Sequence, residues 1–226
     1  MSPAARALQE EGLTTRRLEP ADVGQVLDLH RRALQHMADP QWVRPEAPEF
    51  FDEVLGPGGS GIGAFDAEGE LVAYALLQTR LEEDDLAHLF WSDGGTDMVA
   101  KFCGSAVAPE WRGRRLQQTL SLERLEMADS LGMQRLFATA APGNAASWVS
   151  LLNAGMQIGA LGLRYGGRLR YTLVRDEQLP DEEAEPALRD LQDLEGQKEL
   201  LEQGWRGVTL ATLPDGGRRL ELRPCR

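Results

Sequence analysis

The run Leu71–Leu77 constrains the fold more than any other part of the sequence. Its seven residues, LVAYALL, are all apolar or aromatic, without the alternation of a strand that exposes one face to water. Such a run predicts a central strand covered on both faces. A second apolar run, Ile62–Phe65, precedes it across the turn residues DAEG at 66–69, which predicts a hairpin. The chain therefore needs packing layers on both sides of a sheet.

Helical patterns lie on both sides of this hairpin in the sequence. Residues 19–22 (EPAD) form a helix-start signal before an apolar stripe of period 3.6. The longest helical pattern places Leu116, Leu120, Met127 and Leu131 at spacings of four, seven and four residues, before Gly132. The other expected elements are strands at 14–18, 98–107 and 136–140, helices at 46–55 and 144–153, and a hairpin of 156–163 with 169–174. This order predicts an α/β sandwich with a mixed sheet.

The charge and the composition limit the class of partner. The 226 residues carry a net charge of −12 at pH 7, and an acidic protein repels phosphate backbones, so we do not expect nucleic acid as the main partner. No stretch approaches the roughly 20 apolar residues that span a bilayer, and residues 1–12 lack the apolar core of a signal peptide. Cys103 and Cys225 fit a reducing cytoplasm. The three His and two Cys have no zinc-ligand spacing, so no metal is expected.

The composition changes at Glu177. Residues 177–202 hold ten acids against two basic residues, and the last 24 residues hold five Arg against two acids. We expect a main domain at 13–176 and a C-terminal extension at 177–226, with an acidic linker, a polar helix at 186–203 and a hairpin of 207–213 with 219–222. The extension belongs either to the core of the fold or to a surface for a partner, for example in a homodimer.

The most informative stretch is VAPEWRGRRLQ at 107–117. A strand ends at Val107, a short basic loop follows, and a helix begins. Free N–H groups and the positive end of the helix dipole suit this place to an anion. Arg112, Arg114 and Arg115 add positive charge in an otherwise acidic chain. The alternative is that these arginines only lie at a solvated helix start.

This stretch resembles the pyrophosphate loop of the GCN5-related N-acetyltransferases (the GNAT family). The family pattern is Arg or Gln, two residues, Gly, one residue, then Gly or Ala. Arg112 matches the first position, and Gly113 completes the usual Arg-Gly pair. The sequence departs from the pattern at both later glycines, which are Arg115 and Gln117 here. A Cβ atom at those two places could crowd a phosphate that approaches the backbone.

The stretch NAASWVSLLNAGM at 144–156 resembles the second signature of the same family. There an Asn opens a helix beside the pantetheine arm of the cofactor, which implies cofactor contacts at Asn144 and Ser147. Both residues also suit a plain capping role, and the two roles can coexist. The order of elements over residues 14–175 fits the family as well. The resemblance implies a GNAT-like mixed, mostly antiparallel sheet flanked by helices, followed by the C-terminal extension.

The resemblance implies an acyl-CoA-dependent N-acyltransferase that moves an acetyl or short acyl group from acetyl-CoA to an amine of a small molecule or peptide. The pantetheine would pair with backbone at Ala106 and Val107, and the phosphates would lie at residues 112–117, Leu116 included. The Val107 N–H would stabilise the oxyanion, and the amine would attack the thioester directly. A non-catalytic protein of the same fold that binds acyl-CoA or another ligand is the alternative.

Acid–base residues are less defined. Many family members carry a Tyr in the second signature as the acid, and Leu151 stands at the matching position. His30 falls on the apolar stripe of the first long helix, either as a catalytic residue at the acceptor pocket or as a core histidine. Cys103 is either an acyl-accepting nucleophile or a buried structural residue. His88, Asp93 and Asp97 lie in a loop-rich segment that could line the pocket.

Overall fold

The computed structural model describes residues 3–81, 91 and 98–226, and the chain divides into two compact units, residues 1–136 and 137–226. Each unit is described by itself. His88, Asp93 and Asp97 lie outside the described residues. The expected boundary between 176 and 177 is a different division of the chain and stays a prediction.

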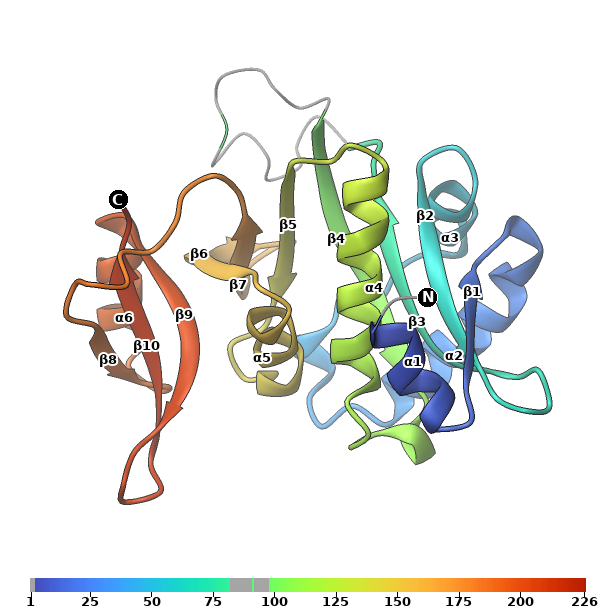
Figure 1. The fold of residues 1–226 in the computed structure, drawn as a ribbon, viewed down its shortest axis with the longest axis horizontal. Coiled ribbons are helices and arrows are strands. Elements are labelled where there is room, and N and C mark those ends of the chain that lie inside the picture. The colour runs from blue at the N-terminus through green and yellow to red at the C-terminus, as the bar shows by residue number, and fades with distance from the viewer. Residues whose placement is uncertain (1–2, 82–90, 92–97) are drawn as a thin grey trace. The chain divides into compact units, whose positions relative to one another are not determined.

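In its described residues, the first unit combines four antiparallel strands with helices on both faces of the sheet (Figure 1). Its helices and strands are α1 (Pro3–Glu10), β1 (Thr14–Arg17), α2 (Val23–Gln35), α3 (Pro48–Leu55), β2 (Gly59–Phe65), β3 (Leu71–Gln78), β4 (Val99–Val107) and α4 (Leu116–Ser130). The strand order β1-β2-β3-β4 is that of the chain, and each neighbouring pair is antiparallel. Helices α1 and α4 lie on one face and α2 and α3 on the other.

The core of the first unit confirms the covered central strand. All eight residues of β3 are buried. Tyr74 and Phe51 are fully buried on the side of α2 and α3, and Leu120 of α4 packs in the same core cluster. Burial of each such side chain contributes on the order of 1.5–3 kcal/mol. The unbroken apolar run therefore correctly predicted a covered central strand, because helices exclude water from both faces of β3.

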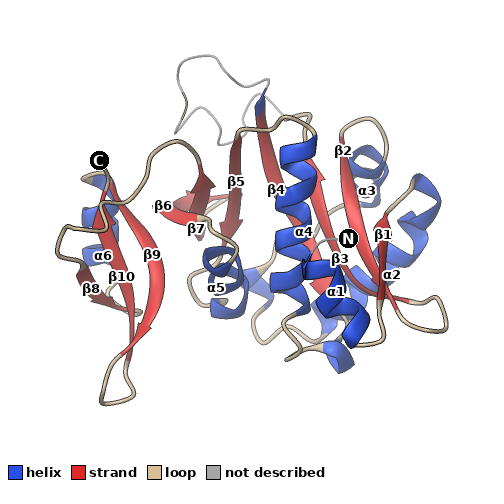
Figure 2. Cartoon of the chain, viewed as in Figure 1, coloured by secondary structure: helices blue, strands red, loops and turns tan. Residues whose placement is uncertain are grey.

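The second unit contains α5, α6 and strands that pair in the antiparallel direction (Figure 2). Its elements are β5 (Arg135–Ala140, which begins at the end of the first unit), α5 (Ala145–Asn153), β6 (Gln157–Arg164), β7 (Arg168–Arg175), β8 (Ala187–Asp190), α6 (Leu194–Glu202), β9 (Trp205–Thr212) and β10 (Arg218–Pro224). The strand order is β5-β7-β6-β9-β10-β8. Trp148 and Tyr171 meet edge to face in its core, with ring centroids 5.8 Å apart.

The expected α/β class, with a mostly antiparallel sheet flanked by helices, is confirmed. Two segments differ from expectation. Residues 3–10 form a helix that the polar N-terminus did not suggest. The expected helix over 186–203 is wrong in its first half, because Ala187–Asp190 pairs with β10 as strand β8. The Asp193 carboxylate accepts a hydrogen bond from the Gly196 N–H at 3.0 Å and so starts α6 one residue later.

The charge asymmetry of the C-terminal part has a structural explanation. Carboxylates of the acidic segment pair with arginines of β10 and of the C-terminus. Asp181 contacts Arg226 at 2.6 Å, and Asp190 contacts Arg219 at 3.2 Å. The arginines of the last 24 residues therefore offset part of the negative charge of residues 177–202. Among the described helices, none is both long and apolar enough to cross a membrane.

Candidate active site

The loop between β4 and α4 has the backbone geometry of an anion site. Residues Pro109–Trp111 form a short 3-10 turn, and α4 begins at Leu116. Gly113 and Arg115 both have positive φ, 82° and 59°. The Arg115 side chain makes no capping hydrogen bond to α4. Because the first N–H groups of a helix have no partner within the helix, Leu116 and Gln117 present donors at the positive end of the dipole.

Arg115 adopts a conformation that favours glycine. A non-glycine residue in the left-handed region is uncommon and costs on the order of 1 kcal/mol or more. Arg115 is the position at which the family pattern has a glycine, so the loop keeps the backbone shape although the side chain differs. Strain of this kind is often retained at binding sites.

The three loop arginines have different surroundings. Arg112 donates hydrogen bonds to the carbonyl oxygens of His36 and Ala33, at 3.0 and 3.3 Å, at the end of α2. Arg114 pairs with Glu11 at 3.5 Å and lies over the Trp111 ring at 4.5 Å. Arg115 is exposed to solvent. The loop is thus held between the end of α2 and the N-terminal segment.

The last residues of β4 differ in the direction of their backbone groups. The Ala108 N–H donates to the Val72 carbonyl at 2.8 Å, and the register pairs Ala73 with Val107. Hydrogen-bonded and non-hydrogen-bonded pairs alternate in an antiparallel ladder. The Val107 N–H and C=O consequently point to the side of β4 away from β3, whereas those of Ala106 point toward β3. Val107 is therefore the better placed of the two predicted residues to bind a ligand through its N–H.

His30 and Tyr74 form a buried pair in the same unit. The His30 Nδ1 atom lies 2.8 Å from the Tyr74 hydroxyl, and the ring packs edge-on against Phe51 with centroids 5.1 Å apart. His30 is 7% exposed, and its Nε2 atom is buried without a hydrogen-bond partner among the described residues. Burial lowers the pKa of His30, with a smaller contribution from Arg31, so the ring is neutral at pH 7. Tyr74 is the register partner of Ala106.

Cys103 lies on β4 near this pair. Burial raises the pKa of the Cys103 thiol to about 12. A thiol that stays protonated at neutral pH is a poor nucleophile, which favours the structural role over an acyl-cysteine. Both Cys103 and Cys225 are free thiols.

In the second unit, Asn144 stands at the N-cap position of α5, but its side chain makes no capping hydrogen bond. Asn144 and Ser147 are both half-buried. Leu151, at the position of the family's Tyr, is 5% exposed and belongs to the core. The Tyr165 hydroxyl lies 3.1 Å from the Thr139 hydroxyl in the same unit.

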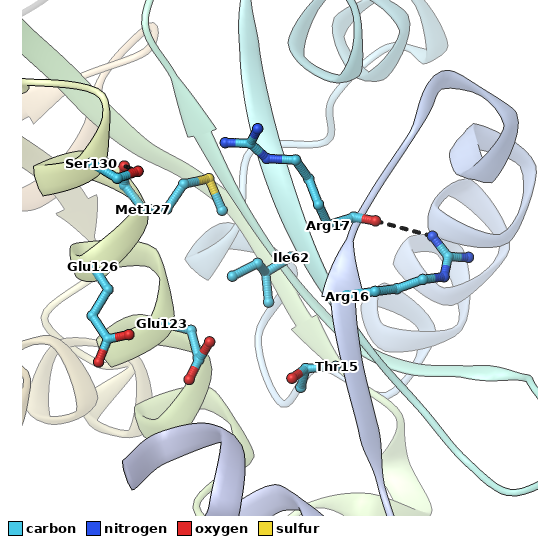
Figure 3. A pocket seen from close by; sticks show the side chains of 8 residues that line it. All are labelled: Thr15, Arg16, Arg17, Ile62, Glu123, Glu126, Met127 and Ser130. Carbon is cyan, nitrogen blue, oxygen red and sulfur yellow. Dashed lines mark hydrogen bonds between the residues drawn. The ribbon is translucent and has the colours of Figure 1, made fainter. Parts of the chain in front are cut away.

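A groove on the first unit lies apart from these residues. It has a volume of about 310 Å³. Figure 3 shows Glu123 and Glu126 of α4 on one side, Arg17 of β1 on the other, and Ile62 between them. The remaining lining residues are Thr15, Arg16, Met127 and Ser130. None of the residues expected at the acyl-CoA site lines this groove.

Sequence reasoning missed two buried residues beside the site, Tyr74 and Arg124. Each left a signal. Tyr74 carries the single hydroxyl of the apolar run 71–77. The helical spacing of four, seven and four residues skips position 124, where the stripe expects an apolar side chain and the sequence has Arg. No group of His, Cys, Asp and Glu among the described residues is arranged to hold a metal ion.

Solved structures similar to this one are acetyltransferases. The ribosomal-protein-S18-alanine N-acetyltransferase from Escherichia coli is 17% identical, with 76% of this chain and 99% of that chain covered and a TM-score of 0.55. A GNAT superfamily phosphinothricin acetyltransferase from Sinorhizobium meliloti, in complex with acetyl-CoA, is 17% identical over 73% of this chain and 88% of that chain, with a TM-score of 0.55. A GCN5-related N-acetyltransferase from Kribbella flavida is 18% identical over 74% and 99%, with a TM-score of 0.54.

At these identities the similarity shows the fold. Comparison with curated protein sequences finds no match. The model of the Acetyltransferase (GNAT) family matches residues 25–149, more than half of the chain. That match includes β3, β4, the arginine loop and α4, and it ends within α5. The chain belongs to the GNAT family of acetyltransferases.

Proposed function

We propose that the chain is an acyl-CoA-dependent N-acyltransferase (class EC 2.3.1) that uses acetyl-CoA or another short acyl-CoA and acts in the cytoplasm. The observation that carries this proposal is the loop at the start of α4. Gly113 and Arg115 both hold left-handed backbone there, beside the first N–H groups of a 15-residue helix. Unpaired N–H groups at the start of a helix favour a phosphate. The acetyl-CoA complex of the Sinorhizobium meliloti relative supports the choice of ligand.

The reaction proposed for this site needs no covalent intermediate on the protein. The amine nitrogen of the acceptor attacks the thioester carbonyl carbon, the C–S bond breaks, and the CoA thiolate leaves. The Val107 N–H, directed away from β3, donates to the carbonyl oxygen as negative charge develops on it. The thiolate can leave without a strong acid, because thiols have a pKa near 8.5. Asn144 and Ser147 would bind the pantetheine arm.

One proton must leave the amine as the amide forms. His30 is the proton acceptor in this proposal, since its ring is neutral at pH 7. Because its Nε2 atom is buried, the proton would pass to it through a water molecule. If Nδ1–H donates to the Tyr74 hydroxyl, the lone pair of Nε2 is the one that can accept the proton. The acceptor amine belongs to a small molecule or a peptide, and its identity follows from loops that vary between family members.

The alternative is a ligand-binding protein of the same fold without turnover. Arg115 and Gln117 in place of two loop glycines favour it, as does the buried Leu151 in place of a tyrosine acid. A thiol-release assay with acetyl-CoA and a panel of amines separates the two functions. The panel should include polyamines, amino acids and peptides with a free N-terminus. Amine-dependent release of CoA thiol supports the enzyme, whereas acetyl-CoA binding without release from any amine supports the binding protein.

A further inference from the structure

Arg124 is a buried cation on the sheet-facing side of α4. Its residue is 2% exposed. The Nη1 atom donates hydrogen bonds to the carbonyl oxygens of Leu76 on β3 and Cys103 on β4, at 2.9 and 3.0 Å. The guanidinium also lies over the Phe102 ring, 3.8 Å from its centroid. One side chain of the helix thus joins the two central strands.

Burial of this charge is costly. Nε of Arg124 has no hydrogen-bond partner among the described residues, and its attractive contacts are two carbonyl oxygens and an aromatic ring rather than a carboxylate. Burial lowers the pKa of Arg124 to about 9, so the group is still charged at neutral pH. A charge buried without a counter-ion destabilises a fold relative to an apolar side chain of similar size. The burial of the Arg124 charge therefore needs a structural explanation.

The structural explanation lies in the register of the two strands. Ala75 pairs with Ser105 and Leu76 pairs with Cys103, so Gly104 is an extra residue on β4. A bulge of this kind interrupts the ladder and re-aims the strand beyond it. The two carbonyl oxygens that accept from Arg124 belong to the register pair at the edge of the bulge. Arg124 therefore contacts both strands at the bulge.

The strand beyond the bulge is the one that ends at Val107. Only two residues, Ser105 and Ala106, separate Gly104 from Val107. The direction of the Val107 N–H therefore depends on where the extra residue is accommodated. We propose that Arg124 is a positioning residue for acyl transfer, which fixes the β4 bulge through the Leu76 and Cys103 carbonyls and so aims the Val107 N–H at the thioester carbonyl. This inference rests on the proposed function.

The test compares Arg124→Met with wild type in two measurements that need no acceptor amine. Calorimetry gives the Kd values of CoA and acetyl-CoA. Because the two ligands differ by the acetyl group alone, the ratio of the two Kd values measures how much the acetyl group contributes to binding. Infrared spectroscopy of acetyl-CoA labelled with ¹³C at the carbonyl gives the stretching frequency of the bound thioester, which falls when its oxygen accepts a hydrogen bond. We expect the Kd ratio of CoA to acetyl-CoA to fall about threefold to tenfold in the variant, the value of one hydrogen bond. The bound carbonyl frequency should return toward its value in water.

Two further variants sharpen the comparison. Arg124→Lys keeps a charged donor and should restore part of the frequency shift. Ser121→Ala is the matched control on the same helix face, because Ser121 is buried and its hydroxyl donates within α4, to the Gln117 carbonyl at 2.8 Å. It should leave the frequency and the Kd ratio unchanged. If Arg124→Met does not fold, Arg124→Leu replaces it, since its apolar side chain also removes every donor.

The outcomes separate this inference from the proposed function. A folded Arg124→Met or Arg124→Leu variant with the wild-type frequency and Kd ratio overturns the positioning role and leaves the enzyme proposal intact. A lower melting temperature with both readouts unchanged means the same, because it shows a structural role alone. Wild-type protein that binds neither CoA nor acetyl-CoA overturns the proposed function, and the positioning role with it.

Discussion

The guanidinium of Arg112 donates a hydrogen bond to the carbonyl oxygen of His36 at 3.0 Å, just beyond the last residue of α2. The same side chain donates to the Val107 carbonyl at 3.4 Å. Arg112 therefore links the end of α2 to the end of β4, in addition to the phosphate contact that the family pattern implies. Both roles predict that its loss weakens cofactor binding.

Replacing Arg112 by Ala should weaken CoA binding by about 1–2 kcal/mol, or roughly tenfold in Kd, because a charge-assisted bond to phosphate is lost. Calorimetry with CoA measures the change. Arg32→Ala is the matched control: Arg32 pairs with Glu110 beside the same loop, and both side chains are largely exposed. Such a surface pair contributes little. Equal Kd values for wild type and Arg112→Ala would remove Arg112 from the binding site.

Replacing Glu11 by Gln should tighten CoA binding about twofold to threefold, the usual magnitude of a surface ion pair. The Glu11 carboxylate lies 3.5 Å from Arg114 and competes with a phosphate for that guanidinium. The gain should shrink as the salt concentration rises, since the pair is exposed. Glu10→Gln, an exposed change on the preceding residue, should have no such effect. Weaker binding by Glu11→Gln would mean that Arg114 needs this carboxylate to hold its position.

If Nε2 accepts the amine proton, replacing His30 by Gln should strongly lower the rate of acyl transfer while the melting temperature changes little. His36→Gln is the control, because His36 is exposed and bonds the Arg32 carbonyl on the same helix. A folded His30→Gln enzyme with full turnover would leave His30 as a core residue only.

The pH dependence of stability gives an independent readout on His30. Its folded-state pKa lies below the ordinary 6.5, so the unfolded chain binds the proton first as the pH falls. The free energy of unfolding should therefore decrease as the pH falls from 7 through 6.5, and His30→Gln should flatten that decrease. Urea unfolding at several pH values measures it.

Removing residues 177–226 should destabilise the second unit. The Tyr171 hydroxyl of β7 donates to Gln197 of α6 in the interior, and Leu201 of α6 is buried. Ile158 of β6 pairs with Gly207 of β9. Chemical denaturation should show a lower unfolding midpoint for the shortened chain. Unchanged unfolding, with loss of a dimer on a sizing column, would instead identify the extension as a partner surface.

The sequence correctly predicted the elements that depend on neighbouring residues in the chain. The apolar run of β3, the turn at 66–69 and the glycine that ends α4 each have one dominant cause, and each was predicted correctly. Gly132 has a φ of 76°, as an ending glycine requires. Leu131 was expected on the buried stripe but is 42% exposed, because it lies past the last turn of α4.

The parts that sequence reasoning missed depend on contacts between distant segments. Strand β8 exists because Ala187–Asp190 meets β10, about 30 residues later. Arg124 interrupts an apolar stripe, and the reason becomes visible only when the register shows the extra residue Gly104. The backbone of Arg115 shows that the loop keeps its left-handed shape without the family's glycine, which no sequence pattern states.

A thermal-shift titration with acetyl-CoA, free CoA and ADP tests the central claim most directly. At about a hundred times its Kd, a ligand should stabilise the fold by roughly 2.7 kcal/mol. The proposal predicts a clear rise in Tm with both CoA species and a smaller one with ADP, which lacks the pantetheine arm. No shift at millimolar acetyl-CoA, or an equal shift with ADP, would contradict an acyl-CoA site built on Val107 and the loop of Gly113 and Arg115.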